Sequence, residues 1–315
     1  MKNKQVMGLI CILISVATWG FLPISTGYVE HIMDSYTITF YRLLFALPIL
    51  IVLKFVFREK WHSFSWKALN NKLTLFLLLC CVLGIVITDI TFAFAVKYCT
   101  PVTINVMFQL APIWFLIGCL VFFKEKITKI QLLGIIIVFI TGLVYFLYGT
   151  NNSGMLKNIP SIYSLIGIGL MLVCTIAWSF FACSQKPLLD KNFSPVDILI
   201  FITFFGSFIM YPFTTPNQIL LLNSFTILNL IITILAFPLG FGFFTLSLKY
   251  WENYKTSVIM TGQPLITVLF VLLVHLLMPK WVGNIQLNII GIICIITTLI
   301  GVLLSLTNKK ICDQT

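Results

Sequence analysis

Long apolar runs separated by short polar clusters dominate this 315-residue chain. Residues 198–248 contain no charged side chain and no histidine, which is room for two membrane spans of about 20 residues each. The runs are too long and too uniformly apolar for the alternating strands of a membrane barrel. They predict an all-α integral membrane protein with ten transmembrane helices, at residues 6–28, 35–57, 74–97, 101–123, 127–148, 162–185, 195–213, 226–248, 256–278 and 283–307.

Composition and charge agree with this pattern. The chain is 60% hydrophobic and 9% charged, whereas about a quarter of a soluble domain is charged. If the N-terminus is cytoplasmic, three of the twenty basic residues fall outside, Arg42 lies within a span and the remaining sixteen lie inside. This is the positive-inside pattern of membrane insertion. We therefore expect a retained first span, both termini in the cytoplasm and no nucleic-acid binding.

The two halves of the chain resemble each other. Residues 95–112 and 247–264 align at an offset of 152 without a gap, with identical residues at Lys97 and Lys249, Tyr98 and Tyr250, Val106 and Val258, and Pro112 and Pro264. Residues 8–19 and 167–178 each run from a glycine to a tryptophan, at an offset of 159. These matches predict a duplicated five-helix unit, with repeats at residues 1–150 and 160–308. Because five is odd, the two copies would be inverted in the membrane, as in transporters that expose a midplane site alternately.

Several features together resemble the drug/metabolite transporter superfamily, and more narrowly its EamA-type exporters. They are the two five-helix halves, the Ala-Thr-Trp-Gly end of the first helix, Arg42 in the second, the fourth-helix pattern through Pro112, and Lys124-Glu125-Lys126 leading to Gly134 and Gly142. The resemblance covers nearly the whole chain. It implies a secondary active transporter in a bacterial cytoplasmic (inner) membrane, which exports or exchanges small metabolites such as amino acids or related compounds. Leu277 stands where the second half should repeat Glu125, which leaves the subfamily open.

Two polar ladders lie at equivalent positions of the predicted repeats. Asn105 and Gln109 are four residues apart and share a face of the fourth predicted helix. Their counterparts, Ser257 and Thr261, do the same in the ninth. A proline follows each ladder and leaves backbone groups unpaired nearby. We predict that these four side chains bind the polar part of a substrate, although hydrogen bonding between helices is the alternative.

Four further residues are candidates for the same site. Asp89 lies past the middle of the third predicted helix, where an ionised carboxylate costs about 2.5–3.5 kcal/mol. It could pair with Arg42 at a similar depth, bind a substrate amino group, or accept a proton as the coupling residue. Trp19 and Trp178 occupy matching positions of the first and sixth helices. They would contact the apolar body of the substrate by stacking, or serve packing alone.

Other chemistries find no support in the sequence. The chain has no P-loop, no zinc-protease or serine-hydrolase motif and no C-x-x-C pair among its nine cysteines. We expect no catalytic residue, no metal and no cofactor. The expected partners are a small-molecule substrate, membrane lipid and, for coupling, protons. A lipid-handling or flippase-like protein with a lateral groove, an intramembrane enzyme and a passive channel remain alternatives.

Overall fold

The computed structural model describes residues 2–56, 71–99, 107–108, 110–122, 128–152, 161–191, 193–251, 253–260 and 262–277, together with Ile104 and scattered positions between 290 and 304. All regular secondary structure in these residues is helical. The all-α prediction is therefore confirmed.

The helices alternate with short connections. They are α1 (Lys2–Glu30), α2 (Ser35–Val56), α4 (Lys72–Val96), α6 (Leu110–Phe122), α7 (Lys129–Asn152), α8 (Ser161–Asp190), α9 (Pro195–Met210), α10 (Ser224–Ala236), α11 (Gly242–Tyr250), α12 (Asn253–Met260) and α13 (Gln263–Leu277). Two 3₁₀ helices, η2 (Tyr211–Phe213) and η3 (Pro216–Leu221), connect α9 to α10. One π-helical turn, η4 (Phe237–Phe241), joins α10 to α11.

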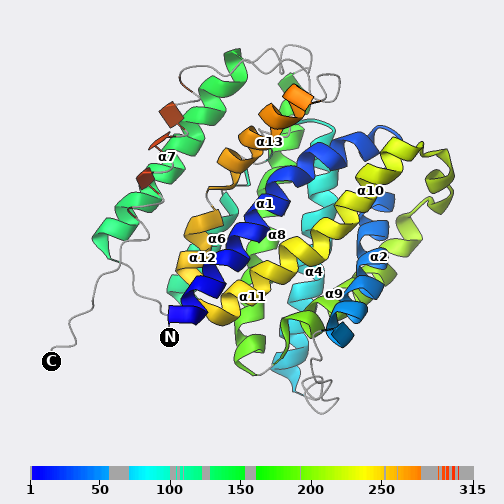
Figure 1. Ribbon diagram of the computed structural model, residues 1–315, viewed down its shortest axis with the longest axis horizontal. Coiled ribbons are helices and arrows are strands. Elements are labelled where there is room, and N and C mark those ends of the chain that lie inside the picture. The colour runs from blue at the N-terminus through cyan, green and yellow to red at the C-terminus, as the bar shows by residue number, and fades with distance from the viewer. Residues whose placement is uncertain are drawn as a thin grey trace.

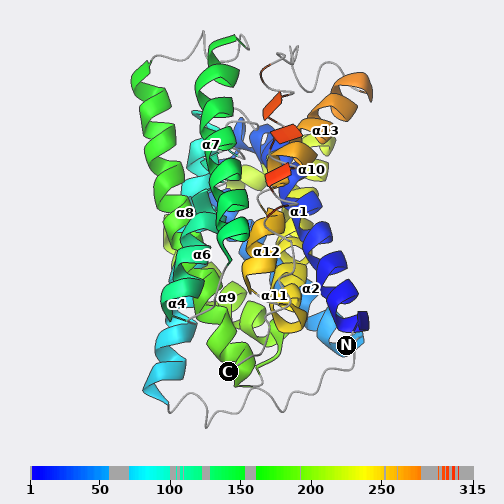
Figure 2. The same cartoon turned by 90° about the vertical axis from the view of Figure 1, so that its left-hand side faces the viewer.

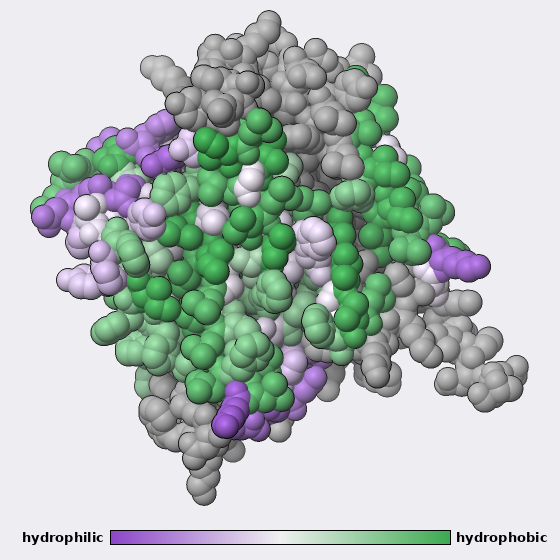
Figure 3. All heavy atoms as spheres, turned by 180° about the vertical axis from the view of Figure 1, so that it is seen from behind, coloured by the Kyte–Doolittle hydropathy of each residue, from purple (hydrophilic) through white to green (hydrophobic). Residues whose placement is uncertain are grey.

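Six helical stretches within the described residues are long and apolar enough to cross a membrane. They are Gln5–Glu30, Ser35–Phe55, Lys72–Val96, Leu165–Asp190, Pro195–Phe213 and Ser224–Tyr250. Shorter apolar helices fall within the predicted fourth, fifth and ninth spans, at Ile113–Phe122, Leu132–Thr141 and Ile266–Leu277. Figure 3 shows a broad belt of hydrophobic residues across the middle of one face, with hydrophilic residues gathered toward its upper left and lower edges. The tenth predicted span lies largely outside the described residues, so the ten-helix count stays a prediction.

Two predicted helices, 226–248 and 256–278, contain irregular turns, and only the second is divided into two helices. The first lies within one continuous helical stretch, Ser224–Tyr250, which includes the π-helical turn with Pro238. Proline has no N–H to continue the helical ladder, and a π turn accommodates the local mismatch. The second ends at Met260 and resumes at Gln263 after a turn at Gly262, whose N–H donates to the Ile259 carbonyl at 3.0 Å.

The packing of the helices is reciprocal between the two halves of the chain. α4 packs on α8 as α11 packs on α1, and α6 packs on α8 as α13 packs on α1. Likewise, α4 contacts α9 as α10 contacts α2. In each of these pairs, exchanging the two predicted repeats turns one contact into the other. A duplicated unit would produce such matched contacts.

These contacts form two bundles. The first contains α4, α6, α8 and α9, and the second contains α1, α2 and α10 to α13. The bundles meet along α2 and α9 on one side, along α6 and α12 on the other, and between these where α4 contacts α1 and α2. Figure 1 shows α2 and α9 on the right, α6 and α12 on the left, and α1, α4, α8 and α11 between them. Figure 2, viewed from that left-hand side, shows α6 and α12 next to each other.

Candidate functional site

A small internal cavity lies where the two bundles meet. Its lining comes from both bundles and consists of Trp19, Leu22, Arg42, Thr88, Asp89, Phe92, Phe108, Trp178, Phe241 and Gln263. The space open to a water-sized sphere is only about 20 Å³, which is enough for one water molecule and far too little for a metabolite. The structure therefore shows this cavity in a closed state.

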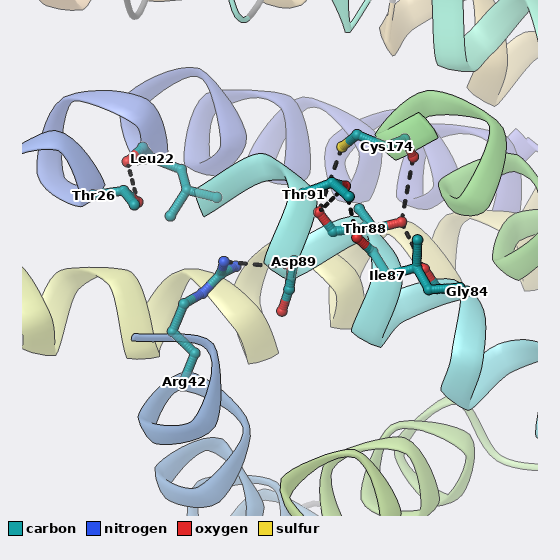
Figure 4. Close-up of polar contacts among 9 residues, drawn as sticks. All are labelled: Leu22, Thr26, Arg42, Gly84, Ile87, Thr88, Asp89, Thr91 and Cys174. Atoms are coloured by element: carbon teal, nitrogen blue, oxygen red, sulfur yellow. Dashed lines mark hydrogen bonds and ion pairs between the residues drawn. The ribbon is translucent and has the colours of Figure 1, made fainter. Parts of the chain in front are cut away.

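An ion pair between the bundles forms one wall of the cavity. Arg42 on α2 points toward Asp89 on α4, and their nearest nitrogen and oxygen atoms are 3.3 Å apart (Figure 4). Both side chains are buried, with exposed fractions of 1% and 3%. The arginine Nη1 lies within ion-pair distance but is not aligned for a hydrogen bond, and Asp89 Oδ2 and Arg42 Nε have no hydrogen-bond partner in the described part of the chain. The charges are compensated, while much of their hydrogen-bonding capacity stays unused.

The backbone around Asp89 is held firmly against α8. The hydroxyl of Thr88 donates to the Gly84 carbonyl at 2.7 Å and lies 3.4 Å from the Cys174 carbonyl (Figure 4). A side chain at Gly84 would approach the Ala177 carbonyl to 2.9 Å, so glycine allows the close contact between α4 and α8. This contact fixes the position of the carboxylate relative to the second half of the chain.

Aromatic rings form the opposite wall. The ring centroids of Trp19 and Trp178 are 6.0 Å apart and the rings meet edge to face, at 88°. Trp19 also contacts Phe241 at 5.1 Å, and Trp178 contacts Phe244 at the same distance. The Trp178 indole N–H has no hydrogen-bond partner among the described residues. Because buried indoles usually find an acceptor, this donor is a candidate ligand-binding group of the cavity.

The π-helical turn positions Trp19. A Cβ atom at Gly240 would lie 2.3 Å from the Trp19 indole nitrogen, so only glycine leaves room for the ring. The Ser15 hydroxyl on α1 donates to the Gly240 carbonyl at 2.7 Å and ties the turn to the same helix. π turns occur frequently at functional sites, where they adjust the direction of nearby groups.

The structure brings together half of the residues proposed from the sequence. Trp19, Arg42, Asp89 and Trp178 all line the cavity. Asn105, Gln109 and Thr261 lie outside the described residues, and Ser257 belongs to α12 without a described side chain. The role of the two polar ladders therefore stays a prediction.

Several lining residues had escaped sequence reasoning as site residues. Phe241 stands 152 residues after Asp89, the offset of the predicted repeat, and the two line the same cavity. Gln263 is a buried polar residue two positions beyond Thr261, a signal that the sequence also contained. Phe108 is one of 29 phenylalanines and had no distinguishing signal.

A closed polar and aromatic cavity between two bundles of membrane-spanning helices is typical of the membrane transport proteins. Residues 6–147 of the chain match the EamA-like transporter family, which confirms the resemblance drawn from the sequence. The matched segment corresponds to the first predicted repeat, residues 1–150.

Similar proteins extend along nearly the whole chain. An uncharacterized inner membrane transporter of Escherichia coli K12, YhbE, is 26% identical over 312 residues, which cover 99% of this chain and 94% of that protein. An uncharacterized transporter of Haemophilus influenzae is 26% identical and covers 99% and 98%, and one of Archaeoglobus fulgidus is 24% identical and covers 91% and 98%. A solved crystal structure superposes with a TM-score of 0.67 and 13% identity over 97% of each chain, which shows a shared fold.

Proposed function

We propose that this protein is a secondary active transporter of small metabolites in the inner membrane of a bacterium, and that the closed cavity is its substrate site. The observation that carries the proposal is the convergence of Arg42, Asp89 and the Trp178 indole at the junction of two helix bundles, each with a polar atom that has no hydrogen-bond partner in the described part of the chain. Buried polar groups without partners are rare, and a ligand would satisfy them. The transporter names of the family and of the relatives favour transport over enzymatic catalysis.

The lining of the cavity suggests the chemistry of the substrate. A carboxylate and a guanidinium lie on one side, and rings from Trp19, Trp178 and Phe241 lie on the other. This suits an amphipathic solute with an apolar body and a polar nitrogen-containing end, such as an amino acid or a related compound. We assign the polar ladders of the fourth and ninth predicted helices to the same polar end.

Substrate entry requires the bundles to separate, because the closed cavity holds about one water molecule. Alternating access would then expose the cavity to one side of the membrane at a time. Exchange against another solute or proton coupling would supply the energy. In the coupled case, Asp89 would bind a proton when the ion pair with Arg42 opens.

The proposal can be tested in cells. We expect the wild-type protein to redistribute at least one small solute between cytoplasm and medium, as measured by mass spectrometry against an empty vector. Asp89→Asn should abolish this effect, because it removes the cavity's carboxylate. Asp190→Asn is the matched control, since Asp190 is exposed at the end of α8. Equal profiles for all variants and the empty vector would contradict the proposal.

A lipid-handling function is the second candidate, because one observation favours it. An apolar groove of about 390 Å³ lies between α6 and α8 and is lined by residues that include Trp114, Ile117, Val121, Phe122, Ile176 and Phe180. Phe115, buried beside the groove, contacts Trp178 of the cavity at a centroid distance of 6.0 Å. Phospholipid scrambling by the purified protein in liposomes would support this alternative over metabolite transport.

A further inference from the structure

The contact between α2 and α9 is fastened at one end by a buried ion pair. The Lys54 ammonium, in the last turn of α2, contacts the Asp197 carboxylate, in the first turn of α9. Their side chains are 0% and 3% exposed. We call this pair the ion-pair clamp.

The opposite end of the same contact is fastened by a network of hydrogen bonds. The Asp34 carboxylate accepts from the hydroxyls of Thr215, at 2.6 Å, and Thr37, at 2.8 Å. The Thr215 N–H donates to the Thr37 hydroxyl at 2.9 Å, and the Asp34 N–H donates to the Gln218 side-chain oxygen at 2.9 Å. The Tyr41 hydroxyl adds a bond to the Pro216 carbonyl at 2.9 Å. We call the group of Asp34, Thr37 and Thr215 the hydroxyl clamp.

In both clamps, one partner lies in the first turn of a helix and donates its backbone N–H to a capping side chain. Ser194 caps α9 by accepting the Asp197 N–H, and Asp34 accepts the Thr37 N–H before α2. Asp197 and Thr37 therefore occupy the same position, three residues after a capping side chain. They differ by 160 residues, close to the offset of the predicted repeat. Each helix start holds the far end of the other helix, so α2 and α9 run antiparallel.

The middle of this contact is also closed. A Cβ atom on Gly206 of α9 would lie 3.0 Å from the Leu43 side chain of α2. The other contact between the bundles, along α6 and α12, lies beside irregular backbone. There the α12–α13 segment is interrupted at Gly262, next to the cavity residue Gln263, and the cavity residue Phe108 lies in a turn before α6.

We propose that the contact between α2 and α9 is a hinge that stays closed throughout the transport cycle, so that the cavity opens on the side of α6 and α12–α13. The inference rests on the proposed transport function. Opening one end of the hinge would separate a buried ion pair, which is costly. Opening the other end would break the hydrogen bonds that Thr215, Pro216 and Gln218 make with the start of α2. Interrupted helices change direction more easily, as hinge-bending and gating segments do.

A cross-link across the hydroxyl clamp tests the hinge. The Thr37 and Thr215 hydroxyl oxygens are 3.3 Å apart, so Thr37→Cys/Thr215→Cys places two thiols close enough to form a disulfide. We expect the oxidised protein, reconstituted in liposomes, to exchange the identified solute at a rate within about twofold of the reduced protein, because a hinge need not open. A greater loss on oxidation, restored by reduction, would show that this contact is a gate and overturn the inference.

Control variants distinguish a wrong hinge from misfolding, from side effects of the oxidant and from a lack of transport. The two single-cysteine variants, treated with the same oxidant, report any effect of the native cysteines. If the double variant does not fold, Leu43→Cys/Gly206→Cys, joined by a short bifunctional thiol reagent, supplies a second cross-link across the middle of the same contact. If the wild-type and reduced proteins move no solute, the transport function fails and the hinge fails with it. If they do and the oxidised protein does not, only the hinge is wrong.

Discussion

At the scale of the residue, the pairing of Arg42 with Asp89 decides how the cavity is charged. Both side chains are almost fully buried, and neither has a full set of hydrogen bonds among the described residues. An ion pair that served packing alone would normally be satisfied by further donors and acceptors. The unused atoms favour a role in ligand binding, and they make the two roles separable by mutation.

Asp89→Asn should destabilise the protein by about 3–5 kcal/mol, because it leaves Arg42 buried without a counter-charge. Thermal unfolding in detergent measures this loss. The double variant Arg42→Met/Asp89→Asn removes both charges and should recover much of the stability, but not transport. Recovery of transport together with stability would show that the pair is only structural.

Gly240→Ala tests how Trp19 is positioned. The added methyl group would meet the indole nitrogen, so either the ring or the π-helical turn must move. Overpacking of this kind costs about 1–3 kcal/mol, and transport should fall with it. Gly169→Ala is the matched control, since nothing lies within 4 Å of the added atom. In the middle of α8, alanine should be neutral or stabilising there. Equal behaviour of the two variants in thermal unfolding would contradict the assignment.

At the scale of the element, the connections between helices also make contacts that stabilise the fold. The segment from Met210 to Asn223 contains two short 3₁₀ helices. Thr215, between them, and Gln218, in the second, form hydrogen bonds with Asp34 at the start of α2. Partial burial would raise the pKa of Asp34, but hydrogen bonds from Thr215 and Thr37 outweigh it and hold the pKa below its ordinary value. The connection between α1 and α2 therefore carries a carboxylate that is kept ionised.

The hydroxyl clamp should weaken in acid. Because the Asp34 pKa is lower in the folded than in the unfolded protein, its stabilising effect is present above the unfolded value, about 4, and is lost as the pH falls through the folded value. Unfolding temperatures of the wild type and Asp34→Asn, measured from neutral pH downward, should converge in acid. A constant difference at all pH values would argue against this contribution of Asp34.

At the scale of the whole molecule, reciprocal packing places equivalent residues of the two halves in one cavity. Trp19 meets Trp178 there, and Asp89 faces the same space as Phe241. A site built this way can have a carboxylate at a position where the other half has an aromatic ring, as with Asp89 and Phe241. Such asymmetry suits a substrate with chemically different ends.

The orientation of the molecule can be measured with an impermeant thiol reagent. The native Cys99 is a poor reporter, because burial raises the pKa of its thiol to about 11. His31→Cys, between α1 and α2, and Lys191→Cys, between α8 and α9, replace exposed residues. From the positive-inside pattern, residue 31 should be labelled in intact cells and residue 191 only after permeabilisation. The reverse pattern would overturn the predicted topology.

Hydropathy is a local property, because each span must satisfy its own backbone in hydrocarbon. The sequence by itself therefore determined the helical class, the position of most spans and four cavity residues that are unusual within apolar runs. It also predicted a repeat, whose offset connects Asp89 with Phe241. The interruption near Gly262 was visible only as a nearby proline.

Only the tertiary structure decided how distant segments meet. Lys54 and Asp197, Asp34 and Thr215, and Ser15 and Gly240 are far apart in the chain, and no periodicity relates them as contacts. The π-helical turn, the closed cavity and the clamped hinge each depend on the packing of several helices against one another. Packing is a collective property of side-chain shape and charge, so these features appear only when the whole bundle is assembled.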